Sequence, residues 1–275
     1  MTSSHPGVSH AAIAARLRAA GCVFAEDEAR LLVSAAARPA DLDDMVRRRA
    51  AGSPLEHVLG WAEFCGLRIS VGPGVFVPRQ RTRHLVRQAA ALAPARAVAV
   101  DLCCGSGALG AALAAQADLA ELHAADIDPA ALRHARRNLP AHAHVHHGDL
   151  FGPLPAHLRG RVHILMANIP YVPTAEIALL PAEARLHEPR TALDGGPDGL
   201  DVLRRLAAEA PHWLAPGGHL LVETARRQAA DACAILAAAG LIPRVAECTA
   251  PPAHVVVAER PQDGPATAGP DTPAA

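Results

Sequence analysis

Short apolar runs alternate with amphipathic stretches in the chain from residue 97 onward. Runs rich in Val, Leu, Ile and Ala predict strands at residues 97–102, 122–126, 144–149, 162–168, 219–224, 244–249 and 253–259. Apolar residues at three- and four-residue spacing predict helices at residues 108–116, 129–139, 200–210 and 225–239. Strands that alternate with helices in this way form a mostly parallel sheet with helices on both faces. The pattern therefore predicts a doubly wound α/β domain.

The segments on either side of this pattern have a different character. Residues 1–55 show helical apolar spacing and predict a small helical N-terminal domain. Residues 56–77 hold β-forming residues broken by glycines, which predicts a β-hairpin connector. The main domain then spans residues 78–260. Residues 261–275 are rich in Pro, Gly and Ala without periodicity, so we expect a disordered tail there.

Composition narrows the class of protein. The chain has 275 residues, 51% hydrophobic and 19% charged, so it can bury a large core and is not disordered throughout. Its formal net charge of -1 offers no broad positive surface for a nucleic acid. The six cysteines form no C-x-x-C pair, so we expect reduced thiols. The sequence has neither a signal-peptide pattern nor a long apolar run, which favours a cytoplasmic protein.

A glycine-rich turn follows the first predicted strand. Asp101 lies at the end of that strand, and Gly105 and Gly107 precede the next helix, which lets the backbone approach a ligand near a helix N-terminus. Asp126 ends the following strand about 20 residues later, where a carboxylate accepts hydrogen bonds from ribose hydroxyls. Asp101 would repel a pyrophosphate and attract a cationic amino acid group. The turn therefore favours S-adenosylmethionine over a dinucleotide.

A second turn, Asn168-Ile169-Pro170-Tyr171, follows the strand at residues 162–168. It lies at the carboxyl end of a parallel strand, where open α/β sheets bind their ligands. The Asn168 oxygen and a neighbouring carbonyl held by proline would accept both N–H bonds of a planar NH2 group. This grip orients the nitrogen for in-line attack on a methyl group. We expect catalysis from Asn168, Pro170 and Tyr171, and substrate contacts from the whole turn.

Longer blocks occur in a fixed order along the chain: RRRAAGSPLEHVLGWAEFCGLRISVGPGVFVPR, DLCCGSGALG, ADIDPAAL, GDLFGPLP, NIPYVP and HEPRTALDGGPDGLDVLRRL. Through them the chain resembles the protein-(glutamine-N5) methyltransferase family, the release factor glutamine methyltransferases of HemK/PrmC type, from Asp27 to about Arg260. The resemblance implies a Rossmann-like class I methyltransferase with a seven-stranded, mostly parallel sheet and a helical substrate-recognition domain. It also implies methylation of a glutamine amide, typically in a Gly-Gly-Gln motif of a release factor.

The resemblance further implies a role for each matching residue. The cofactor-binding residues would be Asp101, Gly105 and Gly107 at the methionine part, Asp126 at the ribose, Asp149 at the adenine, and Asn168. The glutamine amide would be held by Asn168 and the backbone of Ile169 and Pro170, with Tyr171 beside it. S-adenosylmethionine is thus the implied cofactor, and a protein with an exposed glutamine is the implied partner.

Two motifs depart from the family pattern. The usual N-P-P-Y reads Asn-Ile-Pro-Tyr, which removes one stiffening proline. The usual P-R-P-E-T-E reads P-R-Q-R-T-R from Pro78, so that Arg81 and Arg83 stand in place of two acids. The change reverses the local charge beside the expected cleft. We therefore expect a divergent member of the family, with a release factor as one candidate substrate.

Two other functions stay open at this stage. The turn at Asn168 also suits the NH2 group of a nucleobase in DNA or RNA, although no target-recognition domain or basic patch accompanies it. The second alternative is a protein that binds S-adenosylmethionine without turnover and acts through its N-terminal helices. We expect neither a nucleic acid nor a membrane as a partner.

A histidine run attracts attention as a metal site. His142, His144, His146 and His147 include three residues at period-two spacing, which places imidazoles on one strand face. No cysteine lies nearby, and the run coincides with a strand that the fold itself requires. We therefore expect no metal.

Overall fold

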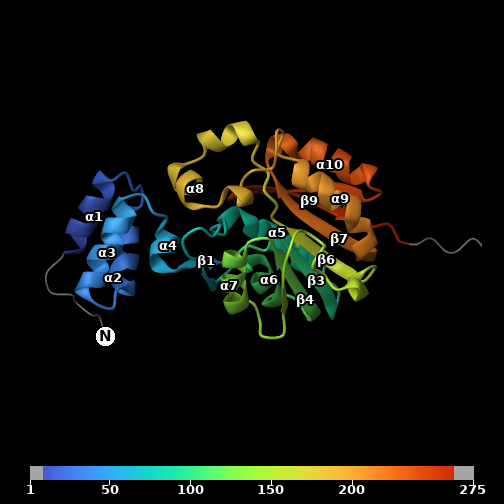
Figure 1. Cartoon of the computed structure of the whole chain (residues 1–275), viewed down its shortest axis with the longest axis horizontal. Coiled ribbons are helices and arrows are strands. Elements are labelled where there is room, and N and C mark those ends of the chain that lie inside the picture. The colour runs from blue at the N-terminus through green and yellow to red at the C-terminus, as the bar shows by residue number, and fades with distance from the viewer. Residues whose placement is uncertain (1–8, 263–275) are drawn as a thin grey trace, which may run out of the picture.

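The computed structural model describes residues 9–262, so residues 263–275 of the expected tail lie outside the described part of the chain. Figure 1 shows a group of N-terminal helices beside a larger α/β part. None of the helices between residues 9 and 262 is long and apolar enough to span a membrane.

The N-terminal helical part consists of α1 (His10–Ala19), α2 (Ala25–Ala35), α3 (Pro39–Ala50) and α4 (Leu55–Leu59). The apolar faces of these helices meet in a core of their own, in which Leu17, Leu32 and Val46 are buried. The hairpin then follows as the antiparallel strands β1 (Trp61–Phe64) and β2 (Leu67–Ser70). The segment expected as a hairpin connector thus begins with a short helix, and its strands occupy the middle of the segment.

Seven strands form the main sheet in the order β5-β4-β3-β6-β7-β9-β8. The first five in this order are parallel, and β9 runs antiparallel to both of its neighbours. Every residue of β3 is buried, as expected for a central strand covered on both faces. The predicted mostly parallel sheet is confirmed. Its strands are β3 (Ala97–Leu102), β4 (Leu119–Asp126), β5 (His144–His147), β6 (Val162–Ala167), β7 (Leu214–Thr224), β8 (Ile242–Thr249) and β9 (Pro252–Glu259).

Helices cover both faces of this sheet (Figure 1). One core contains Leu85, Leu113 and Leu132 from three helices, and the other contains Leu206 and Leu236 from two helices. Alanines are frequent in both cores, which lets the helices lie close to the strands. The helices on the first face are α5 (Arg83–Leu92), α6 (Ala108–Ala114) and α7 (Pro129–Asn138), and those on the second are α9 (Asp201–Trp213) and α10 (Ala229–Ala238).

One helical segment was not predicted from the sequence. Between β6 and α9 the chain forms η3 (Thr174–Leu179), α8 (Ala182–His187) and η4 (Arg190–Ala192). These elements contain no buried residue, so they carry no apolar stripe from which a helix could be recognised. In Figure 1, α8 lies above the junction between the N-terminal helical part and the sheet.

Candidate active site

A cavity of about 1000 Å³ lies at the edge where the parallel strands end. The ends of β3, β4, β5 and β6, with the loops that follow them, contribute Gly105, Asp126, Asp149 and Asn168 to its wall. The segment 180–196 forms another part of the wall. Open α/β sheets bind their ligands at this edge because the strand-to-helix loops gather there. The structure therefore brings the two predicted turns to one cavity.

The glycine-rich turn is fixed to the neighbouring strand. Gly107 is the N-cap of α6 with φ +76°, and a Cβ there would lie 3.1 Å from the Ala135 backbone, so only glycine fits. The Gly105 N–H donates a hydrogen bond to Asp126 Oδ2 at 2.8 Å. A Cβ at Gly105 would meet no atom within 4 Å, so open space borders the turn on that side. The turn thus faces the cavity at Gly105 and the helices at Gly107.

Asp126 lies at the end of β4 on the cavity wall. Its two carboxylate oxygens accept the N–H groups of Gly105 and Asp128, each at 2.8 Å. Burial raises the pKa of Asp126, although these backbone hydrogen bonds oppose that shift. Each oxygen keeps a second lone pair for a ligand hydroxyl. Asp126 can therefore accept hydrogen bonds from a ligand in the cavity, and its contact with a ribose stays a prediction.

Asp101 lies beneath the turn and does not line the cavity. Its side chain is fully buried, and its Oδ2 accepts the Gly110 N–H at 2.9 Å. Its Oδ1 has no hydrogen-bond partner among the described residues. Burial raises the pKa of Asp101 to about 7. The structure thus gives Asp101 a position below the cofactor turn, and its predicted contact with the methionine part stays a prediction.

Two further residues of this half of the cavity differ in character. Asp149 is exposed and forms an ion pair with Arg205 of α9. Cys103 lines the cavity with φ +52°, an uncommon backbone conformation for a residue with a side chain. Burial strongly raises the pKa of the Cys103 thiol, so this side chain is a neutral thiol and not a thiolate nucleophile.

The turn from Asn168 to Tyr171 forms the other half of the cavity. The Ile169 side chain is buried, which anchors the turn in the core. The Asn168 Oδ1 is buried and has no hydrogen-bond partner within residues 9–262. A buried amide oxygen without a partner is costly unless a ligand donates to it. This atom is therefore suited to bind an N–H group in the cavity.

Tyr171 is fixed by two charged side chains. Its hydroxyl donates to Glu223 Oε1 at 2.8 Å and accepts from Arg81 Nη2 at 2.6 Å. Arg81 Nε also lies 2.9 Å from Glu223 Oε1. Burial raises the pKa of Tyr171, and the neighbouring Glu223 adds to that shift, so the phenol stays protonated. Arg81 and Glu223 thus fix the tyrosine ring at the end of the turn.

Sequence reasoning missed Glu223 and the loop that supports the turn. Glu223 is a buried acid in the apolar strand β7, and that unusual placement was the available signal. The supporting loop contains Gly195, whose N–H donates to the Val172 carbonyl at 2.9 Å, and Gly199, where a Cβ would lie 2.3 Å from the Tyr171 carbonyl oxygen. The signal for this loop was its glycine-rich sequence DGGPDG.

The buried side chain of Glu188 holds the segment through which the chain enters the main domain. The Glu188 side chain accepts the Val77 N–H at 3.1 Å and pairs with Arg79 Nη2 at 2.5 Å. Burial raises the pKa of Glu188, while Arg79 acts against that shift. Glu188 and Arg79 line the cavity, as does Pro78. These partners give Glu188 a structural role in joining the segment at residues 77–79 to the cavity wall.

Comparison with known proteins places this geometry in a family. The family model described as "Methyltransferase small domain" matches residues 67–196. A release factor glutamine methyltransferase of Geobacter sulfurreducens is 42% identical over 188 residues, which cover 67% of this chain and 65% of that protein. The match thus spans slightly less than two thirds of that relative. A release factor glutamine methyltransferase of Streptomyces coelicolor is 40% identical over 190 residues, with 67% of each protein covered.

Solved structures support the same fold. A methyltransferase from Pyrococcus furiosus superposes with a TM-score of 0.53 at 17% sequence identity, covering 71% of this chain and 90% of that one. At this identity the likeness concerns the fold alone, and it agrees with a class I methyltransferase architecture. The family is assigned from the curated relatives, because about two fifths of the aligned residues are identical in them and in this chain. This chain belongs to the release factor glutamine methyltransferase family.

Proposed function

We propose that this chain transfers a methyl group from S-adenosylmethionine to the side-chain amide nitrogen of a glutamine in a protein, with a peptide release factor as substrate. The observation that carries the proposal is the buried, unpartnered Oδ1 of Asn168 on the wall of a cavity that Asp126 also lines. An amide acceptor at this position matches the N–H groups of a glutamine side chain. The names of the curated relatives support the release factor as the partner.

The residues present fit S-adenosylmethionine. The cavity of about 1000 Å³ has room for a nucleoside and an amino acid group. Asp126 offers carboxylate lone pairs suited to ribose hydroxyls. Asp101 lies below the turn with an unpartnered Oδ1, and a cationic methionine part above it would favour the ionised carboxylate against the burial that raises its pKa. When bound, the cofactor supplies an electrophilic methyl group on its sulfonium.

The chain's own groups then orient the amide nitrogen. Asn168 Oδ1 accepts one N–H of the substrate amide, and a backbone carbonyl of Ile169 or Pro170 accepts the other. Two acceptors on one NH2 group fix its plane and aim the nitrogen lone pair at the methyl carbon. The acceptors also stabilise the positive charge that develops on nitrogen, and the extra proton leaves to water. Tyr171, held by Arg81 and Glu223, packs beside the amide and limits its motion.

The test is a methyl-transfer assay with the purified chain, methyl-labelled S-adenosylmethionine and a release factor that contains Gly-Gly-Gln. Asn168→Ala removes the acceptor, so we expect kcat/KM to fall by at least about 100-fold, as when one preorganised polar contact to a reacting group is lost. Cofactor affinity, measured by calorimetry, should change little. Gln116→Ala serves as the control because Gln116 is an exposed amide that does not line the cavity.

Mass spectrometry with residue-level localisation then separates the possible substrates. A methyl group on the glutamine of the Gly-Gly-Gln motif supports the proposal. Full activity of Asn168→Ala contradicts the role of the turn. Label transferred to DNA or RNA supports the nucleobase alternative, and cofactor binding without any transfer in a cell extract supports the non-catalytic one.

The role of the N-terminal helical part is a further element of the proposal. We propose that residues 1–55 recognise the protein substrate, because Arg49 of α3 contacts Glu183 of α8 and Glu183 lines the cavity. This contact joins the helices to the wall of the site.

The six cysteines are all free, which supports a reducing compartment such as the cytoplasm.

A further inference from the structure

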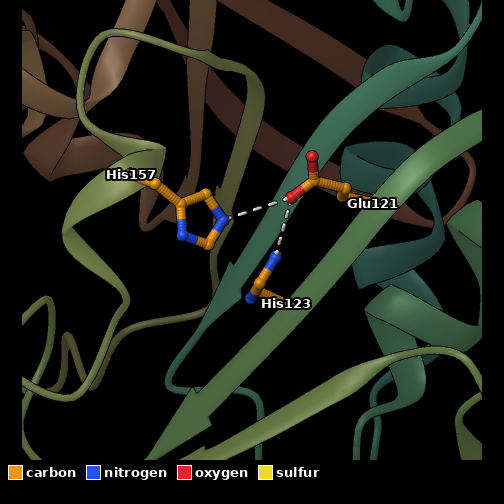
Figure 2. Close-up of side chains that lie close together, drawn as sticks. All are labelled: Glu121, His123 and His157. Carbon is orange, nitrogen blue, oxygen red and sulfur yellow. Dashed lines mark hydrogen bonds and ion pairs between the residues drawn. The ribbon is translucent and has the colours of Figure 1, made fainter.

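A second cluster of chemically active side chains lies near the edge strand of the sheet, in a different place from the cavity. Glu121 and His123 belong to β4, next to the edge strand β5, and His157 belongs to the short helix η2 (Ala156–Leu158). Figure 2 shows the three side chains pointing toward one another. None of the three lines the cavity.

The spacing of the three side chains is that of a coordination site. Glu121 Oε2 lies 3.4 Å from His123 Nε2 and 3.5 Å from His157 Nε2, and the candidate ligand atoms all lie within 4.8 Å of one another. Zinc bonds of about 2.0–2.2 Å in a tetrahedral site put neighbouring ligand atoms about 3.3 Å apart. A charge-assisted hydrogen bond between imidazole and carboxylate is shorter, about 2.7–2.9 Å. The two distances therefore match the separation of neighbouring ligands on one metal ion, and without an ion the first is a long hydrogen bond between His123 and Glu121.

The groups behind these ligands are arranged as in metal sites. His123 Nδ1 lies 3.0 Å from His146 Nε2. A proton on His123 Nδ1 shared with His146 leaves the Nε2 lone pair free for a metal. On the other side, Arg161 Nη2 donates to Glu121 Oε1 at 3.0 Å, which leaves Oε2 free. Each of these two ligands thus has a partner that orients it.

We propose that Glu121 Oε2, His123 Nε2 and His157 Nε2 bind one divalent transition-metal ion, with zinc as the best match. Two imidazoles and one carboxylate suit zinc better than magnesium or calcium, which prefer oxygen ligands alone. Solvent reaches the site because the side chains of Glu121 and His157 are 28% and 56% exposed. A water molecule therefore occupies the fourth position.

The position of the site indicates a structural function. Asp126 lies three residues beyond His123 on β4, about 10 Å along the strand. An ion at Glu121 would tie the loop that carries His157 to the edge of the sheet without reaching the methyl-transfer cavity. We therefore expect the metal to stabilise the fold and to leave cofactor binding unchanged.

Sequence reasoning considered the histidine run at residues 142–147 as a metal site and did not consider Glu121, His123 and His157. His142 lies outside β5 and is exposed, while His144 stacks on His123 with ring centroids 4.7 Å apart. The run thus supplies neighbours and no ligand. The proposed ligands come from residues 121, 123 and 157, whose spacing matches no common metal motif. The expectation of no metal is replaced by this proposal.

The test uses the full chain without an affinity tag, stripped of metal by a chelator and titrated with zinc in a calorimeter. We expect one ion per chain. His157→Ala should weaken zinc binding by at least about 100-fold, because changes in the outer shell alone cost about 10–100-fold in affinity. His157 is exposed, so the variant keeps the fold. His142→Ala is the matched control, an exposed histidine outside the cluster, and should bind zinc like the parent.

Two further measurements complete the test. Cobalt in place of zinc should give the visible absorption of a four-coordinate site in the parent and in His142→Ala, and not in His157→Ala or Glu121→Gln. Zinc should raise the thermal unfolding midpoint of the parent and not that of His157→Ala. The proposal is overturned if the stripped parent binds no zinc, or if His157→Ala and His142→Ala bind it equally well.

Discussion

The environment of Arg81 in the structure differs from the one that the sequence suggested. In the sequence it stands where related proteins have an acid, which predicts a positive charge beside the cleft. In the structure its guanidinium pairs with Glu223 and donates to the Tyr171 hydroxyl. The Arg81 charge is therefore largely compensated, and the arginine supports Tyr171 in the turn at residues 168–171. The charge of Arg81 alone therefore gives no reason to expect a substrate other than a release factor.

Asp101 makes folding stability depend on pH. Its pKa rises from 3.8 to about 7 because the side chain is buried. A carboxyl whose folded-state pKa is raised gives its full stability below the unfolded value, and this contribution is lost as pH rises through the folded value. We therefore expect the parent to lose about 3 kcal/mol of unfolding free energy relative to Asp101→Asn between pH 4 and pH 7.

Urea denaturation at several pH values measures this difference. Both proteins contain every other titrating group, so the difference between their curves isolates Asp101. The unfolding free energy of Asp101→Asn minus that of the parent should increase steadily up to about pH 7. Above that pH the difference should stay constant. Parallel curves for the two proteins would mean that Asp101 is ionised in the folded state at ordinary acidic pH.

At the scale of elements, the turn at residues 168–171, which we propose binds the substrate amide, depends on the glycine-rich loop beside it. Gly199 has φ +79°, and a Cβ there would lie 2.3 Å from the Tyr171 carbonyl oxygen and 2.4 Å from Gln228 Nε2. Gln228 Nε2 also donates to that carbonyl at 3.0 Å. Gly199→Ala should therefore displace the turn and lower kcat/KM for methyl transfer by at least about 10-fold, because misplacing a reacting group by about 1 Å costs up to 100-fold.

Gly240→Ala is the matched control for this prediction. Gly240 has φ +82°, but a Cβ there would meet no atom within 4 Å. Its replacement should cost about 1–2 kcal/mol of unfolding free energy from the left-handed backbone alone and leave transfer unchanged. Chemical denaturation and the transfer assay measure both effects. Equal kinetic losses in the two variants would show that the contact at Tyr171 is unimportant.

The elements differ in how well the sequence predicted them. The bounds of the strand at residues 97–102 were predicted correctly because all six residues are buried and five of them are apolar. The elements η3, α8 and η4 were missed because none of them contains a buried residue, so they show no periodic apolar signal. Glu121, His123 and His157 were missed as a group because only the fold brings them together. Patterns along the chain report burial, whereas sites depend on contacts between distant segments.

At the scale of the whole molecule, one arginine joins the N-terminal helical part to the cavity. Arg49 donates to both carboxylate oxygens of Glu28, at 2.6 and 3.0 Å, and to Glu183 at 2.6 Å. The side chains of Arg49 and Glu28 are 8% and 10% exposed, but that of Glu183 is 47% exposed. The two ion pairs should therefore contribute very differently to stability.

Arg49→Ala and Glu183→Ala separate these contributions. Arg49→Ala leaves the buried Glu28 carboxylate without its cation, which should lower the unfolding free energy by about 3–5 kcal/mol. Glu183→Ala removes a half-exposed partner and should cost no more than about 1 kcal/mol. It should still release α8, so we expect the amides of residues 182–187 to exchange hydrogen faster and the KM for the protein substrate to rise, while cofactor affinity stays the same.

Hydrogen exchange followed by mass spectrometry, together with the transfer assay, tests the link between the two parts. Asp43→Ala is the control because Asp43 pairs with Arg16 at 3.5 Å on the exposed surface of the same helical part. It should leave exchange in α8 and the KM unchanged. If Glu183→Ala behaves like Asp43→Ala, the Arg49 contact does not hold α8 in place. The proposed recognition of the substrate by the N-terminal helices would then have to depend on another contact, since Glu183 of α8 is the cavity-lining residue that Arg49 contacts.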